Sequence, residues 1–113
     1  MPATEFLEAL RPRSEVELAV QRSGRWTTRP VWFAVDGATV YLLPMYGTDT
    51  KWYKYVTVSP EIELSVEGKR VRAQARVLLD AEHLADVAKR FRSKYGDLER
   101  YYRKIDVAVA VTI

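Results

Sequence analysis

Apolar and polar residues alternate along much of the chain, which is the pattern of strands that bury one face and expose the other. Between these stretches lie short turn sequences, and Asp36-Gly37 is the strongest of them, because both positions tolerate a positive φ. The alternation predicts five strands, over residues 16–21, 31–35, 38–43, 61–66 and 70–79. Residues 105–113 are apolar on both faces and predict a sixth strand, central in a sheet or buried in a dimer.

One long stretch instead shows the 3.6-residue spacing of an amphipathic helix. It begins after Asp80, a preferred N-cap residue, and ends at Gly96, a common helix terminator. We therefore predict one main packing helix between the last two strands. Its apolar stripe consists of Leu84, Val87, Ala88, Phe91 and Tyr95. Residues 97–104 are expected to form one or two further helical turns.

Two shorter helices are expected near the start and the middle of the chain. Thr4 can cap a helix over residues 5–10, and residues 1–12 would then form an N-terminal helical lid. Thr50 can cap another helix over residues 51–56. The free N–H groups at its start would favour an anion in the preceding loop.

Consecutive hairpins favour antiparallel pairing and closure of the sheet into a small barrel. We therefore expect a mainly β structure with helices, of the α+β class. It would contain an antiparallel six-stranded barrel and one main packing helix. The 113 residues are enough for one domain with its own core, so residues 1–113 are taken as a single domain.

Composition then narrows the chemistry. The chain has no cysteine, which excludes disulfides, thiolate metal sites and a cysteine nucleophile, and it has a single histidine, His83. A metal site built from several histidines is therefore excluded within one chain, and a Ser-His-Asp triad is disfavoured. His83 lies beside Glu82 in the first turn of the predicted main helix, where we interpret it as a solvated surface residue. No metal is expected.

The charge balance permits an anionic ligand without requiring nucleic acid, since 18 basic residues face 15 acidic ones. Arg70, Arg72 and Arg76 project from one side of the predicted fifth strand, and Glu61 and Glu63 are their expected cross-strand partners. We interpret this face as solvated and salt-bridged. No stretch approaches the roughly 20 apolar residues of a membrane span, and no secretory signal pattern is present, so a cytoplasmic location without membrane association is expected.

The candidate chemistry concentrates in residues 25–33, which contain two guanidiniums, two hydroxyls and two indoles. Arginine presents a planar fork of donors that suits a phosphate group, and threonine hydroxyls can occupy the remaining acceptor sites. Pro30 fixes the backbone, so this polar cluster is placed at the start of the strand over residues 31–35. Such a segment can bind an anion and a flat ring together. The alternative is an ordinary turn with solvated arginines and core tryptophans.

The order of these motifs resembles the flavin and deazaflavin split-barrel superfamily, which includes pyridoxamine-phosphate-oxidase-like proteins and deazaflavin-dependent nitroreductases and quinone reductases. Its Gly-Arg-x-Thr-Gly-Arg-Pro segment is matched by Gly24-Arg25-Trp26-Thr27-Thr28-Arg29-Pro30, followed by the Asp36-Gly37 hairpin. Its Gly-containing loop and Trp-Tyr-x-Asn-Leu helix are matched by Gly47 and Trp52-Tyr53-Lys54-Tyr55-Val56. Ser59-Pro60 corresponds to its Asn-Pro before a Glu-rich strand.

Four positions depart from the family pattern. Thr28 replaces a glycine, Val31 replaces a basic residue, and Tyr55 replaces the asparagine. Tyr46 stands before the loop glycine, where the deazaflavin branch often has lysine. These departures leave the choice open between FMN and the deazaflavin coenzyme.

The resemblance implies an FMN-binding-like split β-barrel and a homodimer, with a flavin-like ring in a groove at the subunit boundary. The cofactor phosphate would be held by Arg and Thr groups at the start of the strand, and the loop would close the other side. The cofactor-binding residues it implies are Arg25, Thr27, Thr28, Arg29, Tyr46, Gly47, Thr48, Lys51 and Trp52. A hydroxyl of Tyr101 or Tyr102 would orient the substrate.

Three functions follow as hypotheses. The first is a reductase that transfers hydride from FMN or a deazaflavin to a small acceptor, such as a quinone, a nitro compound or an enone. The second is a split-barrel module that binds a ligand or forms dimers without catalysis. The third is a small barrel that binds single-stranded nucleic acid through the alternating basic and aromatic residues 51–55, which the near-balanced charge disfavours.

Overall fold

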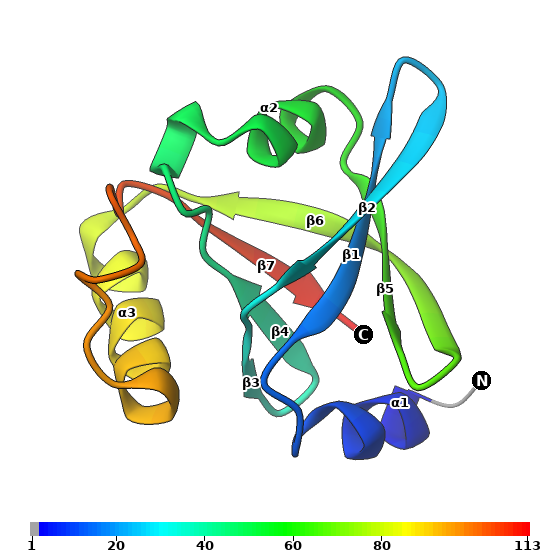
Figure 1. The fold of residues 1–113 in the computed structure, drawn as a ribbon, viewed down its shortest axis with the longest axis horizontal. Helices are drawn as coiled ribbons and strands as arrows, with labels where there is room; N and C mark the ends of the chain where they lie inside the picture. Colours follow the sequence, from blue (N-terminus) through cyan, green and yellow to red (C-terminus); the bar gives the residue numbers. More distant parts are fainter. Residues whose placement is uncertain (1–2) are drawn as a thin grey trace.

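Seven antiparallel strands form one curled sheet in the computed structural model, which describes residues 3–113 (Figure 1). The strand order across the sheet is β2-β1-β5-β6-β7-β4-β3. Residues 1 and 2 of the expected lid lie outside the described residues. The elements are α1 (Ala3–Leu10), β1 (Val16–Arg22), β2 (Arg25–Val31), β3 (Ala34–Asp36), β4 (Thr39–Leu42), a 3₁₀ turn (Gly47–Asp49), α2 (Lys51–Val58), β5 (Glu61–Val66), β6 (Lys69–Leu78), α3 (Ala81–Tyr95) and β7 (Ala108–Thr112).

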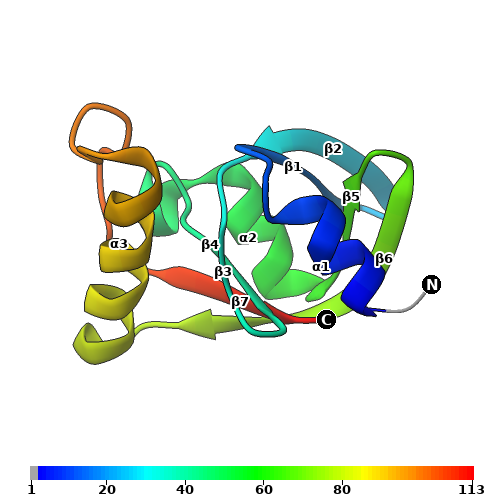
Figure 2. The ribbon, with the colours of Figure 1, turned by 90° about the horizontal axis from the view of Figure 1, so that it is seen from below.

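The sheet curls into a half-barrel. With its three helices the structure belongs to the expected α+β class. Helices α1 and α2 lie at opposite ends of it, and α3 lies against its outer side (Figures 1 and 2). Helix α1 contributes three buried side chains to the core inside the barrel, and α2 contributes three more at the other end. A second, smaller apolar cluster lies between α3 and the sheet. The barrel therefore has one inner core and one outer core.

Strand β7 belongs to both cores, which explains why its sequence is apolar on both faces. Val109 and Val111 are fully buried inside the barrel, whereas Ala108 is fully buried in the cluster beneath α3. The strand lies between β6 and β4. The expectation of a central strand is confirmed.

Several local predictions are also confirmed. Two of the short turn sequences between the alternating stretches, Ser23-Gly24 and Glu67-Gly68, turn with positive φ at each residue, and each joins the two strands of a hairpin. At the start of α3 the Asp80 carboxylate accepts a hydrogen bond from the backbone N–H of His83 at 3.1 Å, and Gly96 ends the helix at a φ of 86°. These short sequences fix the backbone locally, so they could be interpreted without tertiary information.

The prediction of a strand over residues 31–35 was wrong, and so was the count of six strands. The polar residues 25–31 form β2 themselves, paired with β1 through seven residue pairs from Val16↔Val31 to Arg22↔Arg25. The chain then breaks at Trp32-Phe33 before the short strand β3. Pro30 is tolerated within β2 because β2 is an edge strand, where one side of the backbone needs no ladder partner.

Two helical predictions also need correction. Residues 97–104 form a single turn and no regular helix: the backbone N–H groups of Tyr101 and Tyr102 both donate to the Leu98 carbonyl. Thr50 precedes α2, but its side chain caps nothing; its hydroxyl accepts a hydrogen bond from the Tyr46 N–H at 2.8 Å. None of the described helices is long and apolar enough to cross a membrane.

The arginine face is salt-bridged, but through one carboxylate. Glu63 pairs with Arg72 at 3.4 Å and with Arg70 at 3.8 Å, whereas Glu61 lies opposite Gln74. Arg76 donates to the Thr112 hydroxyl at 3.4 Å. His83 is exposed, and its Nδ1 lies 2.7 Å from an Asp80 carboxylate oxygen.

The outer core leaves room only for small residues on the α3 side of β7, which gives the first prediction. Replacing Ala108, which is fully buried, with Leu should destabilise the fold by about 1–3 kcal/mol through overpacking. The matched control is Ala85→Leu on the exposed face of α3, which should change stability by less than about 0.5 kcal/mol. Urea unfolding of both variants measures the difference. Equal stabilities would contradict this packing.

Candidate functional site

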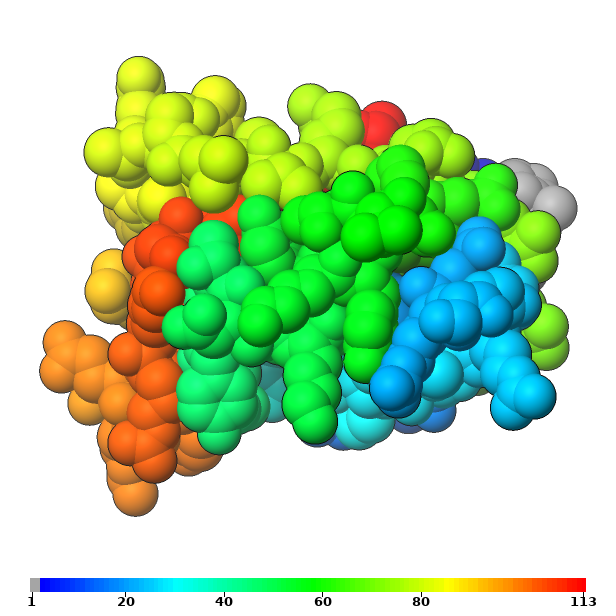
Figure 3. All heavy atoms as spheres, turned by 90° about the horizontal axis from the view of Figure 1, so that it is seen from above, coloured from blue at the N-terminus to red at the C-terminus, as the bar shows by residue number. Residues whose placement is uncertain are grey.

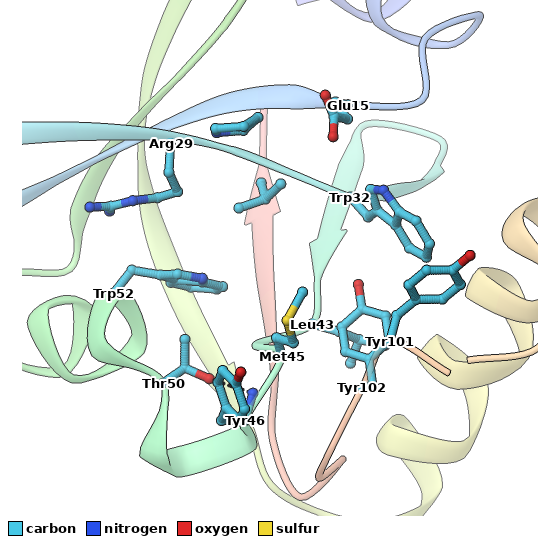
Figure 4. A pocket seen from close by; sticks show the side chains of 12 residues that line it. Glu15, Arg29, Trp32, Leu43, Met45, Tyr46, Thr50, Trp52, Tyr101 and Tyr102 are labelled. Carbon is cyan, nitrogen blue, oxygen red and sulfur yellow. Dashed lines mark hydrogen bonds between the residues drawn. The ribbon is translucent and has the colours of Figure 1, made fainter. Parts of the chain in front are cut away.

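A cavity of about 340 Å³ opens between the end of β2, the loop after β4, the start of α2 and the segment after α3 (Figure 4). This volume is within the usual range for small-molecule sites. Its lining is mostly aromatic and apolar, with one basic and one acidic side chain. The lining residues are Glu15, Arg29, Pro30, Val31, Trp32, Leu43, Met45, Tyr46, Thr50, Trp52, Tyr101 and Tyr102.

Arg29 marks the α2 end of this cavity. Its Nη2 donates to the Thr27 hydroxyl at 2.8 Å, while its Nη1 is buried and has no hydrogen-bond partner within residues 3–113. Burial lowers the pKa of Arg29 from its usual value. A buried donor without an acceptor is costly, so this end of the cavity is suited to an acceptor supplied by a ligand.

A second hollow of about 330 Å³ adjoins the first at this end. It shares Arg29, Tyr46, Thr50 and Trp52 with the main cavity and adds Asp49 and Lys51. Figure 4 shows the Arg29 guanidinium extending toward α2 and away from Trp32. Two cationic side chains, Arg29 and Lys51, therefore border the α2 end of the site.

The loop before α2 is held by a carboxylate from the far end of the chain. Asp106 accepts two hydrogen bonds from Thr48, one from its N–H and one from its hydroxyl, both at 2.9 Å. Lys104 bridges Asp106 at 3.4 Å and Asp49 at 3.3 Å. Burial alone would raise the pKa of Asp106, but the Thr48 hydrogen bonds and the Lys104 ammonium outweigh it and lower that pKa.

This contact brings together segments that are distant in sequence. Figure 3 shows the loop and α2, in green, beside the orange segment that leads into β7. Tyr46 and Lys104 form a parallel bridge at the same place. The loop conformation therefore depends on residues 104–106.

Aromatic side chains form the opposite end of the cavity. The Trp32 indole lies 4.8 Å from the Tyr101 ring and 6.0 Å from the Tyr102 ring, centre to centre. Burial raises the pKa of Tyr102, so its hydroxyl remains protonated at neutral pH and can donate a hydrogen bond. A flat ring between the two ends would meet aromatic and apolar surface.

The structure brings together six of the residues expected at the site and separates the others. Arg25 lines neither hollow, and Thr27 contacts the site only through Arg29. Thr28 faces the other side of β2, in a separate hollow of about 420 Å³ beside Trp26 and the salt-bridged Arg72. The six that line the two hollows are Arg29, Tyr46, Lys51, Trp52, Tyr101 and Tyr102.

The reason is strand geometry: successive side chains of a strand point to opposite faces, so residues 27 and 29 share one face and residue 28 takes the other. Gly47 and Thr48 also have a different role from the one expected. Both donors of Thr48 are used by Asp106, and Gly47 lies against the same carboxylate with a φ of 57°. They shape the loop and do not line the cavity.

Sequence reasoning missed several lining residues. Trp32 belongs to the 25–33 segment but was placed in a strand that does not form, and Glu15 was given no role. Leu43, Met45 and Thr50 flank motifs that were noticed, so a wider loop definition would have included them. Nothing in the sequence places Glu15 or Trp32 opposite Tyr101.

The chain was compared with known families and structures. The model of the family described as "Uncharacterized protein conserved in bacteria (DUF2255)" matches residues 6–112. No curated protein matches the sequence at a significant level.

Three solved structures illustrate the likeness in fold. A FAD-binding protein from Mesorhizobium loti is 18% identical with a TM-score of 0.71, covering 100% of this chain and 88% of its own. An F420-H2 dependent reductase (FDR-A) is 19% identical with a TM-score of 0.66, covering 88% and 94%. HutZ, the heme storage protein from Vibrio cholerae, is 15% identical with a TM-score of 0.74, covering 96% and 87%.

At these identities the comparison establishes the fold alone. It is the split-barrel fold that these neighbours share, so the fold expected from the sequence motifs is confirmed. Flavin-type and heme-binding proteins both occur on this fold, and the ligand must therefore be argued from the side chains.

The loop geometry gives the second prediction. A Cβ at Gly47 would collide with the Asp106 carboxylate, whereas a Cβ at Gly37 would meet no atom within 4 Å, although both glycines have a φ near 60°. Gly37→Ala should therefore cost about 1 kcal/mol, from backbone strain alone. Gly47→Ala should cost at least about 1 kcal/mol more, because the loop must move. Urea unfolding measures both, and equal costs would show that Asp106 does not constrain the loop.

Proposed function

The chain belongs to the family of uncharacterized proteins conserved in bacteria (DUF2255), and we propose that it is a flavin- or deazaflavin-binding oxidoreductase. The cofactor would be FMN or the deazaflavin coenzyme, and the substrate a small acceptor such as a quinone, a nitro compound or an enone. The observation that carries this proposal is the buried Nη1 of Arg29, which has no hydrogen-bond partner among residues 3–113 and lies at one end of an aromatic cavity.

The residues present fit such a cofactor. Arg29 and Lys51 offer charged donors to a phosphate or carboxylate tail at the α2 end of the site. Trp52, Leu43 and Met45 offer apolar contact to a planar ring in the middle. Thr27 keeps the Arg29 guanidinium in place through its hydroxyl. A tail-binding end and a ring-binding middle are the two features that a flavin or deazaflavin requires.

The bound ring would supply the hydride, and the chain's own residues would have to bind, orient and exclude water. Tyr102 keeps its proton at neutral pH, so its hydroxyl can donate to a carbonyl or nitro oxygen of the acceptor. Tyr101, at the same end and 45% exposed, can contact the substrate as it enters. The positions of the two tyrosines in the cavity support the substrate-orienting role proposed for them.

Heme fits less well than a flavin. A heme iron usually needs an axial ligand, most often a histidine. The single histidine of the chain, His83, is exposed on α3 and paired with Asp80, and it does not line the cavity. The cavity therefore lacks the commonest axial ligand of heme, and only Met45 and the tyrosines of its lining are of a type that can bind the iron.

We further propose that the protein acts as a homodimer. Three large side chains at or beside the mouth of the cavity are exposed in the single chain: Met45 by 46%, Tyr46 by 51% and Tyr101 by 45%. Exposed apolar surface next to a ligand site is typical of an interface. A second copy over this mouth would exclude water from the ring.

The alternative is a ligand-binding module without catalysis. It is favoured because both hydrogen-bond donors of Thr48 are used by Asp106, which leaves fewer groups for a cofactor than the family motif implies. The nucleic-acid hypothesis loses support, because Trp52 and Tyr53 are each only 8% exposed and present little surface to an extended single strand.

The third prediction separates the arginines of β2. Arg29→Ala should weaken binding of FMN or F420 by about tenfold or more, equivalent to about 1.4 kcal/mol, because it removes the buried donor. Arg25→Ala, outside the two hollows, should change affinity by less than about twofold and is the matched control. Quenching of cofactor fluorescence on titration measures both.

The same titration judges the whole proposal. Absence of FMN and F420 binding by the unmodified protein at tens of micromolar would remove the oxidoreductase. Binding without reduction of quinones or nitro compounds would instead support the non-catalytic module. A Soret band on addition of hemin, with no flavin binding, would reverse the preference over heme.

A further inference from the structure

The geometry points to Tyr95 of α3 as a positioning residue that fixes Trp32, and with it the wall of the cavity opposite Arg29. Tyr95 does not line the cavity itself. The inference rests on the proposed function, because it concerns how selectively that site accepts a planar ligand. It assigns Tyr95 a role beyond filling the outer core.

The Tyr95 hydroxyl connects two segments that are far from it in sequence. It accepts a hydrogen bond from the Phe33 N–H at 3.0 Å and donates to the Ser14 carbonyl at 2.8 Å. Ser14 directly precedes Glu15, and Phe33 directly follows Trp32. One hydroxyl therefore holds the backbone beside two cavity-lining residues.

These hydrogen bonds occur where the sheet offers none. Trp32 and Phe33 lie in the break between β2 and β3, so the Phe33 N–H has no ladder partner. The Phe33 carbonyl lies 3.0 Å from the same hydroxyl and accepts a further hydrogen bond from Lys94 Nζ at 3.2 Å. Side chains of α3 thus make the hydrogen bonds to the Phe33 backbone that a neighbouring strand would otherwise make.

The Tyr95 ring fixes the indole as well. The Trp32 and Tyr95 rings are stacked with their centres 4.1 Å apart and their planes within 5°. The Tyr101 and Tyr102 rings meet the same indole at angles of 59° and 64°. Stacked rings of this kind contribute about 0.5–1.5 kcal/mol beyond their buried area. Trp32 is consequently held in one orientation.

The hydrogen bonds of the Tyr95 hydroxyl persist across the physiological range of pH. Burial raises the pKa of Tyr95 to about 12, so its hydroxyl keeps the proton that it donates. Helix α3 is itself held against the sheet, since Val87 and Phe91 are almost fully buried in the outer core. The indole that faces the ligand is therefore set by a helix that does not touch the ligand.

The experiment uses four variants of the whole chain: Tyr95→Phe, which keeps the ring and loses the hydroxyl, Tyr95→Leu, which loses both, Trp32→Leu, and the double variant. The control is Val87→Ala, which weakens the same helix in the same core. Two quantities are measured: the FMN dissociation constant, and the tryptophan bands of the near-ultraviolet circular dichroism spectrum. Urea unfolding confirms that each variant is folded.

We expect Tyr95→Phe to weaken FMN binding by about threefold and Tyr95→Leu by about tenfold, because the indole becomes free to rotate. In the Trp32→Leu background, Tyr95→Leu should weaken it by less than about twofold, since its target is gone. Tyr95→Leu should also diminish the tryptophan bands to the extent that Trp32→Leu does. Val87→Ala should lower stability and leave affinity and spectrum unchanged.

Two results would overturn the inference: an equal effect of Tyr95→Leu in both backgrounds, or a loss of stability with unchanged affinity and tryptophan bands. If the unmodified protein binds neither FMN nor F420, the proposed function fails separately. The tryptophan bands alone then decide whether Tyr95 positions Trp32: loss of the Trp32 contribution in Tyr95→Leu supports the inference, and an unchanged spectrum overturns it.

Discussion

The backbone ladder between β1 and β2 is the constraint on which the candidate site depends. Seven residue pairs hold the polar segment 25–31 in an extended conformation at the edge of the sheet. Extended backbone sends alternate side chains to opposite faces, so Arg29 and Thr27 turn toward α2 while Thr28 turns away. A motif that reads as a continuous anion-binding loop is thereby divided, and one guanidinium carries most of its potential for binding.

The two ends of the cavity are built by different means. At the α2 end the loop is shaped by charge, with Asp106 and Lys104 holding Thr48 and Asp49. At the other end the wall is shaped by stacked rings that α3 supports from behind. The polar end suits the charged tail of a ligand, and the aromatic end suits a planar body. Because the two ends differ in polarity, a ligand with a charged tail and a planar ring is expected to bind with its tail at the α2 end.

In the proposed reaction, the side chains of the site would orient the reactants and would do little acid-base chemistry. Burial keeps the Tyr102 hydroxyl protonated at neutral pH, and no cluster of metal-ligating side chains lies within residues 3–113. A reaction in which the ring itself transfers hydride asks little acid-base work of the protein. The selectivity of the site for its substrate would then depend on the aromatic wall of the cavity and on what covers the exposed mouth of the cavity.

The sequence by itself determined the features that depend on neighbouring residues: the turns at Ser23-Gly24 and Glu67-Gly68, the cap and end of α3, and the order of motifs that indicates a split barrel. It also indicated Arg29, Tyr46, Lys51 and Trp52 as site residues, and these side chains line the two hollows. Only the tertiary structure showed that residues 25–31 are a strand, because their pairing with β1 outweighs a turn-like composition. Likewise, only tertiary contacts bring Glu15, Trp32 and Asp106 to the site, since such long-range pairing leaves no periodic pattern along the chain.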